Sequence, residues 1–281
     1  MKQRIITALV ATCVLIPALI FHESFILPVG IAACCVIAVY EMLHCLALHK
    51  SVVLSVPLYI AAAAFPILIR YMSDRDMVKT LAFASVALLC LYFFTVMIFS
   101  HGKYPIGQIS VLFFSLLYIL IGFNAILVIH DWAQGGTYLY LICFIGAWIT
   151  DIFAYFCGML FGRGGKHKLI PDVSPKKTVE GSIGGIAFCV LSMILYAWIV
   201  EMLAPGSNAN MIVFATAGLF ASIVSQVGDL SMSVIKRTYG IKDYGKLFPG
   251  HGGVLDRFDS VLAVSVVMLV FTMLFDFVEM V

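Results

Sequence analysis

The most polar stretch of this chain runs from Gln226 to Asp259 and mixes acids, bases and glycines. Carboxylates repel phosphates unless a divalent cation lies between them. Mg²⁺ takes oxygen ligands and usually binds through one or two carboxylates together with substrate phosphates. The mixture of charges therefore predicts a site for a metal ion and a nucleotide, rather than a simple anion pocket. Its charged side chains are Asp229, Lys236, Arg237, Lys242, Asp243, Lys246, Asp256, Arg257 and Asp259.

The start of this stretch has helical spacing. Asp229, Ser233, Lys236 and Arg237 stand at i, i+4, i+7 and i+8, and residues so spaced share one face of a helix. That face carries an acid, a hydroxyl and two bases, and it leads directly into the polar segment 236–258. We therefore expect Asp229 to be functional rather than only structural.

A histidine and two glycines lie further along, at His251, Gly252 and Gly253. The histidine could donate to a phosphate or make a structural hydrogen bond. It is not expected to bind metal, because Mg²⁺ prefers oxygen ligands and no second histidine stands at ligand spacing. Cysteine is absent from this stretch and from the other long polar segment of the chain, residues 161–181, which argues against a zinc site.

A second polar segment, 161–181, is also basic and rich in glycine. Backbone amides freed by glycine, together with lysines and hydroxyls, suit phosphate groups. The sequence is not a Walker A loop, and a basic loop beside anionic lipid headgroups is the alternative interpretation. The candidate phosphate-binding residues of this segment are Ser174, Lys176, Lys177 and Thr178.

Asp151 interrupts an apolar run. A charged residue at the centre of a membrane helix costs at least ~2.5 kcal/mol on insertion scales, so it needs a partner, an ion or a polar interior. A structural role and a functional role are both open for Asp151. Tyr155, Gly158 and Gly162 share its helical face, where the small residues would let another helix approach closely.

The composition indicates the elements that must position these residues. Of 281 residues, 63% are hydrophobic and 11% are charged, whereas a soluble domain is about half apolar and about a quarter charged. A helix needs ~20 apolar residues to cross a bilayer, and the apolar runs here are continuous rather than alternating as in membrane strands. All eight cysteines lie in these runs and are expected to be buried small side chains.

The predicted fold is an all-α integral membrane protein, a polytopic bundle of about nine transmembrane helices forming a single membrane domain, 1–281. Residues 1–137 form the N-terminal helices, and 138–281 form a catalytic region with the long loops 161–181 and 236–258. The expected spans are 5–21, 25–48, 52–71, 79–99, 105–130, 138–160, 182–203, 210–235 and 259–280.

The distribution of basic residues predicts the orientation. All of the 17 Lys and Arg residues except Arg70, Arg75 and Lys79 fall on the side of the N-terminus and the two long loops. Cytoplasmic loops carry the excess of Lys and Arg, so both loops are expected in the cytoplasm. Most of these bases belong to the two loops themselves, so the orientation depends on them.

The run SVIKRTYGIKDYGKLFPGHGGVLDRFD, Ser233 to Asp259, resembles the complete signature of the phosphatidate cytidylyltransferase family, the CDP-diacylglycerol synthases. The segment SPKKTVEGSIGG, Ser174 to Gly185, and DIFAYFCGMLFGR, which starts at Asp151, are similar to the same family. The resemblance covers roughly 151–259. The earlier helices match only in being hydrophobic.

The resemblance implies a reaction in which CTP and phosphatidate give CDP-diacylglycerol and pyrophosphate. It implies Mg²⁺ held by Asp229 and Asp256, a second, monovalent cation, and a membrane enzyme that is often dimeric. Lys236, Arg237, Lys242 and Arg257 would neutralise phosphates, and Asp151, Asp243 and Asp259 are further candidates. The expected setting is a bacterial inner membrane with the active site facing the cytoplasm and no nucleic-acid partner.

Three other functions are less consistent with these residues. A transporter would spread polar residues through several spans and show an internal repeat. A CDP-alcohol phosphotransferase would carry a DG-x-x-AR motif, which is absent. The complete run from Ser233 to Asp259 argues against a related lipid-alcohol kinase or another CTP-dependent enzyme of the same superfamily.

Overall fold

A computed structural model of the chain describes residues 16–280 except 18 and 163–166. Packing divides the chain into two compact units. The first unit comprises the described residues up to Asn124 together with Asp243–Asp256, and the second comprises Ala125–Lys242 together with the residues from Arg257 onward. The boundaries between 242 and 243 and between 256 and 257 separate predicted site residues, so the two groups of residues are described separately. The predicted first span, 5–21, lies largely outside the described residues.

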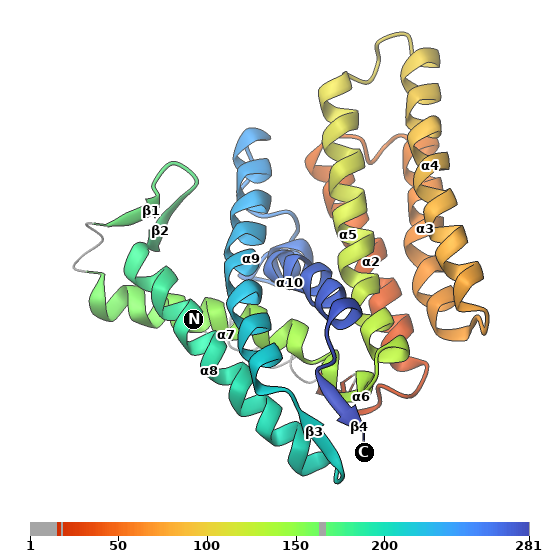
Figure 1. Cartoon of the computed structure of the whole chain (residues 1–281). Helices are drawn as coiled ribbons and strands as arrows, with labels where there is room; N and C mark the ends of the chain where they lie inside the picture. Colours follow the sequence, from red (N-terminus) through yellow and green to blue (C-terminus); the bar gives the residue numbers. More distant parts are fainter. Residues whose placement is uncertain (1–15, 18, 163–166, 281) are drawn as a thin grey trace. The chain divides into compact units, whose positions relative to one another are not determined.

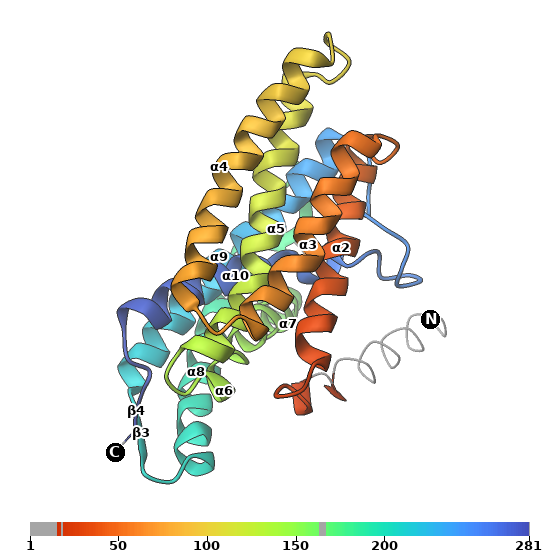
Figure 2. The same cartoon turned by 90° about the vertical axis from the view of Figure 1, so that its right-hand side faces the viewer.

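The first unit is helical. It contains α2 (Ile26–Cys45), α3 (Val52–Tyr71), α4 (Arg75–Phe99) and most of α5 (Ile106–Trp132). Helices α2 and α3 lie side by side, joined by a short connection (Figure 2). Both helices bury aliphatic side chains, such as Leu43 on α2 and Leu58 on α3.

Side chains cap two of these helices. The Ser51 hydroxyl accepts from the amide of Leu54 at the start of α3. Asp74 accepts from the amides of Asp76 and Met77 at the start of α4, with both distances 3.0 Å. The first amides of a helix have no partner within it, and Ser and Asp are preferred for supplying one. The Asp74 cap explains why α4 begins at Arg75, earlier than the expected span 79–99.

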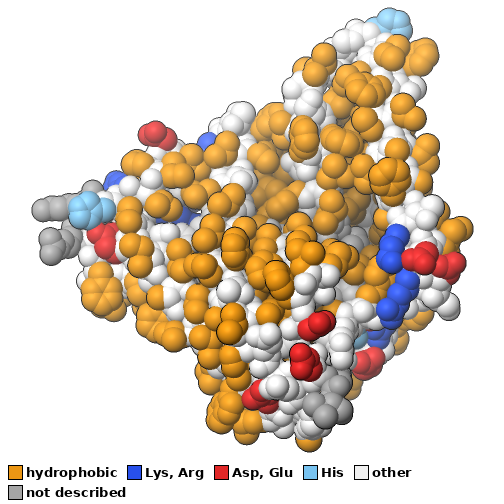
Figure 3. Space-filling model, viewed as in Figure 1, with side chains coloured by type: hydrophobic (Ala, Val, Ile, Leu, Met, Phe, Trp, Pro, Cys, Tyr) orange, Lys and Arg blue, Asp and Glu red, His pale blue; other side chains and the backbone are white. Residues whose placement is uncertain are grey.

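Helix α4 leaves most of its apolar surface uncovered. Phe83 is 80% exposed, although the helix is as hydrophobic as its neighbours. Many exposed hydrophobic side chains lie on the visible surface of α3 and α4 (Figure 3). Such surface suits contact with lipid chains, because a membrane helix needs no polar outer face.

The second unit combines helices with two small sheets. Its helices are the end of α5, α6 (Gly136–Leu139), α7 (Ile142–Phe161), α8 (Val179–Leu203), α9 (Met211–Thr238) and most of α10 (Leu255–Leu274). Strands β1 (Lys168–Ile170) and β2 (Ser174–Thr178) form an antiparallel hairpin between α7 and α8 (Figure 1). Strands β3 (Ser207–Ala209) and β4 (Val278–Met280) form a second antiparallel pair.

Close packing of α7 against α8 depends on glycines. A Cβ at Gly181 would lie 2.5 Å from the carbonyl oxygen of Ala154, and one at Gly185 would lie 2.9 Å from that of Thr150. A Cβ at Gly158 would lie 2.9 Å from the hydroxyl of Thr178. Small residues allow membrane helices to approach this closely. The expectation that Gly158 permits close helix approach is confirmed.

Eight helices of the described residues are long and apolar enough to cross a membrane. The predicted all-α polytopic membrane fold is confirmed, with about nine as an approximate count. The two small sheets were not predicted. The loop after α9 is shorter than expected, because α9 continues to Thr238 and α10 begins at Leu255 rather than near 259.

Candidate active site

The predicted site residues on α9 occupy its last turns. The hydroxyl of Ser233 donates to Asp229 Oδ1 at 3.4 Å, one helical turn away. Lys236 is buried, with 8% exposure, and the exposed Arg237 guanidinium donates to the carbonyl of Ile241 at 3.4 Å. The predicted shared face is confirmed for Asp229 and Ser233 by this contact. The helix then ends before Gly240, whose φ of 68° is left-handed.

A lysine of the hairpin completes this group. Lys177 Nζ on β2 lies 2.5 Å from Asp229 Oδ2, and both side chains are about three-quarters covered. The hairpin therefore brings a base from segment 161–181 to the acid of segment 226–259. Its neighbours differ in setting: Lys176 is exposed and Ser174 is half-buried. The Thr178 hydroxyl accepts from the amide of Gly181 at 3.1 Å and so caps α8.

Two further acids belong to the same group. The hydroxyl of Ser260 on α10 donates to Asp151 Oδ2 at 3.0 Å, and the amide of Ser260 donates to Asp259 Oδ1 at 2.9 Å. Asp151 and Asp259 both interact electrostatically with Asp229. Asp151 therefore has a hydrogen-bond partner, Ser260, and also interacts with a second carboxylate, that of Asp229.

This second-unit cluster joins four segments of the chain. Bases oppose its acids: Lys177 and Arg257 interact with Asp151, and Lys236 interacts with Asp259. Like charges so close together raise one another's energy unless cations neutralise them. The members of the cluster are Asp151, Lys177, Asp229, Ser233, Lys236, Arg257, Asp259 and Ser260.

The carboxylates and hydroxyls of the cluster offer oxygen atoms, the ligands that Mg²⁺ prefers. An ion held by one or two of the carboxylates of Asp151, Asp229 and Asp259 would keep coordination positions for phosphate oxygens. The donor set fits Mg²⁺ bound together with a nucleotide.

The first unit holds a separate group around Asp256. This side chain is 8% exposed, and its Oδ2 accepts from the amides of Tyr244 at 2.7 Å and Gly253 at 2.9 Å. The loop wraps tightly around the carboxylate: a Cβ at Gly252, where φ is 89°, would lie 2.6 Å from Oδ2. Backbone amides hold this acid in one orientation, as is usual for carboxylates that bind metals.

The other candidates of this loop are less enclosed. Lys242 and Asp243 are exposed. The amide of His251 donates to the carbonyl of Phe248 at 2.8 Å in a tight turn. Its ring Nδ1 is buried without a hydrogen-bond partner among the described residues. The roles of Asp229 and Asp256 as joint metal ligands stay a prediction, because the two residues fall in different units.

Glu41 is a buried acid that the sequence analysis did not single out. It lies on α2 with 3% exposure, and its two oxygens accept from the amides of Val254 and Leu255 at 2.9 and 2.8 Å. The sequence does mark Glu41, because it is a carboxylate inside the expected span 25–48. A charged residue in a membrane helix needs a partner, which is the argument that selected Asp151.

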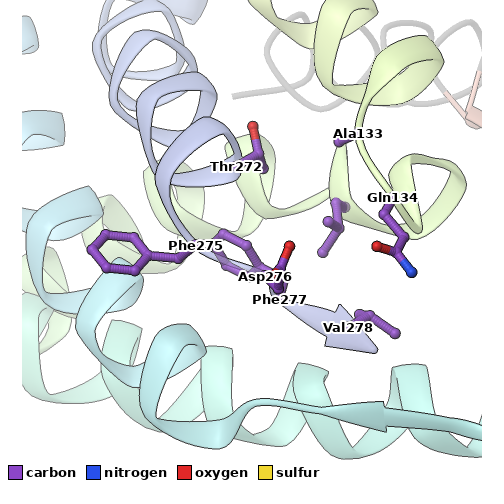
Figure 4. Close-up of a pocket in the computed structure, with 8 residues that line it drawn as sticks. Ala133, Gln134, Thr272, Phe275, Asp276, Phe277 and Val278 are labelled. Carbon is purple, nitrogen blue, oxygen red and sulfur yellow. The ribbon is translucent and has the colours of Figure 1, made fainter. Parts of the chain in front are cut away.

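A small pocket elsewhere in the second unit contains none of the predicted site residues. It lies between the end of α5, α6 and the segment that joins α10 to β4, where Gln134, Thr272 and Asp276 supply polar atoms (Figure 4). Its size suits small polar molecules such as water rather than a nucleotide or a lipid headgroup. We assign it no role in the site.

Comparisons with known proteins agree with the chemistry of these residues. The model of the cytidylyltransferase family matches residues 2–275. A phosphatidate cytidylyltransferase of Staphylococcus haemolyticus is 31% identical over 264 residues, which cover 94% of this chain and 96% of that protein. Enzymes of the same name from Staphylococcus saprophyticus and Staphylococcus aureus are 32% and 30% identical over the same shares. This membrane protein therefore belongs to the cytidylyltransferase family.

Proposed function

We propose that this enzyme transfers the cytidylyl group of CTP to phosphatidate, giving CDP-diacylglycerol and pyrophosphate. Family membership and the names of the relatives support the reaction. At the level of residues, the proposal is supported by the ion pair of Lys177 with Asp229, which lies within a cluster of three carboxylates. The three carboxylates lie on helices able to span a membrane, which suits one water-soluble substrate and one that resides in the bilayer.

The chemistry asks little covalent participation of the protein. A phosphate oxygen of phosphatidate forms a bond to the α-phosphorus of CTP, while the bond from that phosphorus to the bridging oxygen breaks and pyrophosphate leaves. The second pKa of a phosphate monoester is ≈ 6, so the attacking group is already ionised near neutral pH and needs no general base. Positioning and neutralisation of charge are then the main contributions of the enzyme.

We propose Asp229 and Asp256 as the acids that would hold Mg²⁺, as the resemblance implies, with Asp151 and Asp259 nearby in the second-unit cluster. Mg²⁺ when bound would supply positive charge to phosphate oxygens. Ser233 orients the Asp229 carboxylate through its hydroxyl. Lys177 neutralises Asp229 and has further N–H donors for a phosphate.

Other basic residues would bind the remaining phosphate groups of the two substrates. Lys236, Lys242 and Arg257 suit the triphosphate or the lipid phosphate, and Arg in particular binds phosphate through two parallel hydrogen bonds. His251 would donate to a phosphate through its ring. We also propose a cytoplasmic active site, a homodimer and a second, monovalent cation, each on the resemblance or on the charge distribution alone.

The test is an assay of the purified protein in lipid nanodiscs with labelled CTP, phosphatidate and Mg²⁺. We expect labelled CDP-diacylglycerol and an equal amount of pyrophosphate. Diacylglycerol in place of phosphatidate is the control, because a lipid kinase would phosphorylate it whereas the proposed enzyme would not. Absence of CDP-diacylglycerol from a folded protein would rule out the proposed function.

A further inference from the structure

Glu41 connects α2 to the start of α10. Its carboxylate is 3% exposed and lies on a helix whose other residues are nearly all apolar. A carboxylate is costly to bury unless its oxygens are hydrogen-bonded. Both oxygens are used here, each by one backbone amide: Val254 donates to Oε1 and Leu255 donates to Oε2.

These two amides are the first donors of α10. The leading amides of a helix have no partner within the helix, and a negative charge at that end is favourable because the helix dipole is positive there. Such a partner is usually a side chain just before the helix. Here the cap comes instead from a residue more than 200 positions earlier in the chain.

The loop before α10 is shaped around this carboxylate. A Cβ at Gly245 would lie 2.3 Å from Glu41 Oε1, and one at Gly253 would lie 2.1 Å from it. Cβ atoms do not approach oxygen so closely, so a Cβ at either position would push the Glu41 carboxylate aside. The backbone of the loop therefore contacts Glu41 from two separate points.

The same stretch of backbone holds Asp256. Gly253 approaches Glu41 while its amide donates to Asp256 Oδ2. Asp256 follows directly after Leu255, whose amide Glu41 binds. The position of Glu41 and the orientation of the Asp256 carboxylate are thus linked through residues 253–256.

We propose that Glu41 is a positioning residue for cytidylyl transfer, which holds the backbone at 253–255 so that Asp256 keeps one orientation. This inference rests on the proposed function. Residues that orient a metal-binding group usually matter about 10- to 100-fold for metal affinity or activity.

The main test is Glu41→Gln, which keeps the shape but places an amide NH₂ against one of the two backbone donors. Turnover of CTP and phosphatidate would be measured over a range of Mg²⁺ concentrations. We expect kcat to fall roughly 10- to 100-fold, or the Mg²⁺ needed for half-maximal rate to rise by that factor, with a smaller change in KM for phosphatidate. A general loss of stability would also lower the rate at every Mg²⁺ concentration, so a rise in the Mg²⁺ requirement is the kinetic result that identifies positioning.

A second measurement does not depend on enzyme activity. Hydrogen exchange, followed by mass spectrometry without substrates, should be faster in Glu41→Gln at the amides of Gly253, Val254 and Leu255. The matched control is Glu201→Gln on α8, because Glu201 also accepts from a backbone amide, that of Ala209 at 2.9 Å. The control should keep wild-type turnover and wild-type exchange at 253–255.

If Glu41→Gln does not fold, Gly245→Ala tests the same contact by pushing the carboxylate aside without changing it. It should also accelerate exchange at Val254 and Leu255. Wild-type kcat and Mg²⁺ dependence in Glu41→Gln, or unchanged exchange in whichever variant folds, would overturn this inference alone. No product from the wild-type protein would overturn the proposed function, and the inference with it.

Discussion

Lys177 and Asp229 show how the cluster combines residues from distant segments. The lysine belongs to strand β2 and the acid belongs to α9, and their charged atoms lie 2.5 Å apart. Lys176, the adjacent lysine, points into the exposed part of the hairpin's surface. The sequence could propose both lysines as phosphate ligands, but only the hairpin register selects Lys177 as the partner of Asp229.

We predict that Lys177→Met and Asp229→Asn each lower kcat/KM for CTP by roughly 100-fold or more, as expected when one charged group is removed from a reacting site. Because the two side chains contact each other, the double variant should lose less than the product of the single losses. Steady-state kinetics with purified protein would measure this. Fully multiplicative losses would show that the two residues act independently.

The matched control is Lys79→Met on α4, which also removes a lysine from an ion pair with an aspartate. Lys79 Nζ lies 2.9 Å from Asp76 Oδ1, and both side chains are largely exposed. Exposed pairs of this kind contribute little to stability. The control should therefore keep wild-type kinetics.

At the scale of elements, helix boundaries and helix packing have different origins. The start of α4 is set locally by Asp74, whereas the start of α10 is capped by Glu41 from another helix. Hydropathy alone placed the last span at 259–280, four residues late. The contact of α7 with α8 depends on the glycines at 158, 181 and 185, which the sequence marks but does not pair.

We predict that Gly181→Ala destabilises the protein by about 1–3 kcal/mol, the usual cost of overpacking a well-packed contact. The new Cβ would lie 2.5 Å from the carbonyl oxygen of Ala154, and a backbone carbonyl cannot move aside as a side chain can. Thermal unfolding in detergent should show a lower melting temperature. Gly30→Ala on α2 is the control, because a Cβ there meets nothing within 4 Å. Equal melting temperatures for Gly181→Ala and the wild type would contradict the packing argument.

At the scale of the whole molecule, the apolar helices divide the loops between two faces of a membrane. Helix α4 separates the connection that contains Ser73 from the one that contains Lys103, so these two residues must lie on opposite sides if α4 spans the bilayer. From the excess of Lys and Arg we predict that Lys103 lies on the cytoplasmic side. Both positions are exposed and lie outside helices.

We predict that a cysteine replacing Lys103 reacts with a membrane-impermeant maleimide only in inside-out vesicles, and that one replacing Ser73 reacts only in intact cells. Both substitutions would be made in a variant without the native cysteines. Labelling of both positions from the same side would show that α4 does not span the membrane. Reactivity with the two sides exchanged would reverse the orientation and contradict a cytoplasmic active site.

The sequence by itself determined the membrane class, nearly all of the spans and the residues of the signature run. Hydropathy is a sum over neighbouring residues, and a helix satisfies its own backbone, so these properties are local. The position of Asp229, Ser233 and Lys236 in the last turns of one helix could be predicted because helical spacing is also a local property.

The tertiary structure decided which distant residues meet. The pairing of Lys177 with Asp229, the bond from Ser260 to Asp151 and the capping of α10 by Glu41 each join segments that are far apart in the chain. A lone carboxylate in an apolar helix signals only that a partner must exist. Folding identifies the partner, because the energy of a buried charge depends on the groups that packing brings to it.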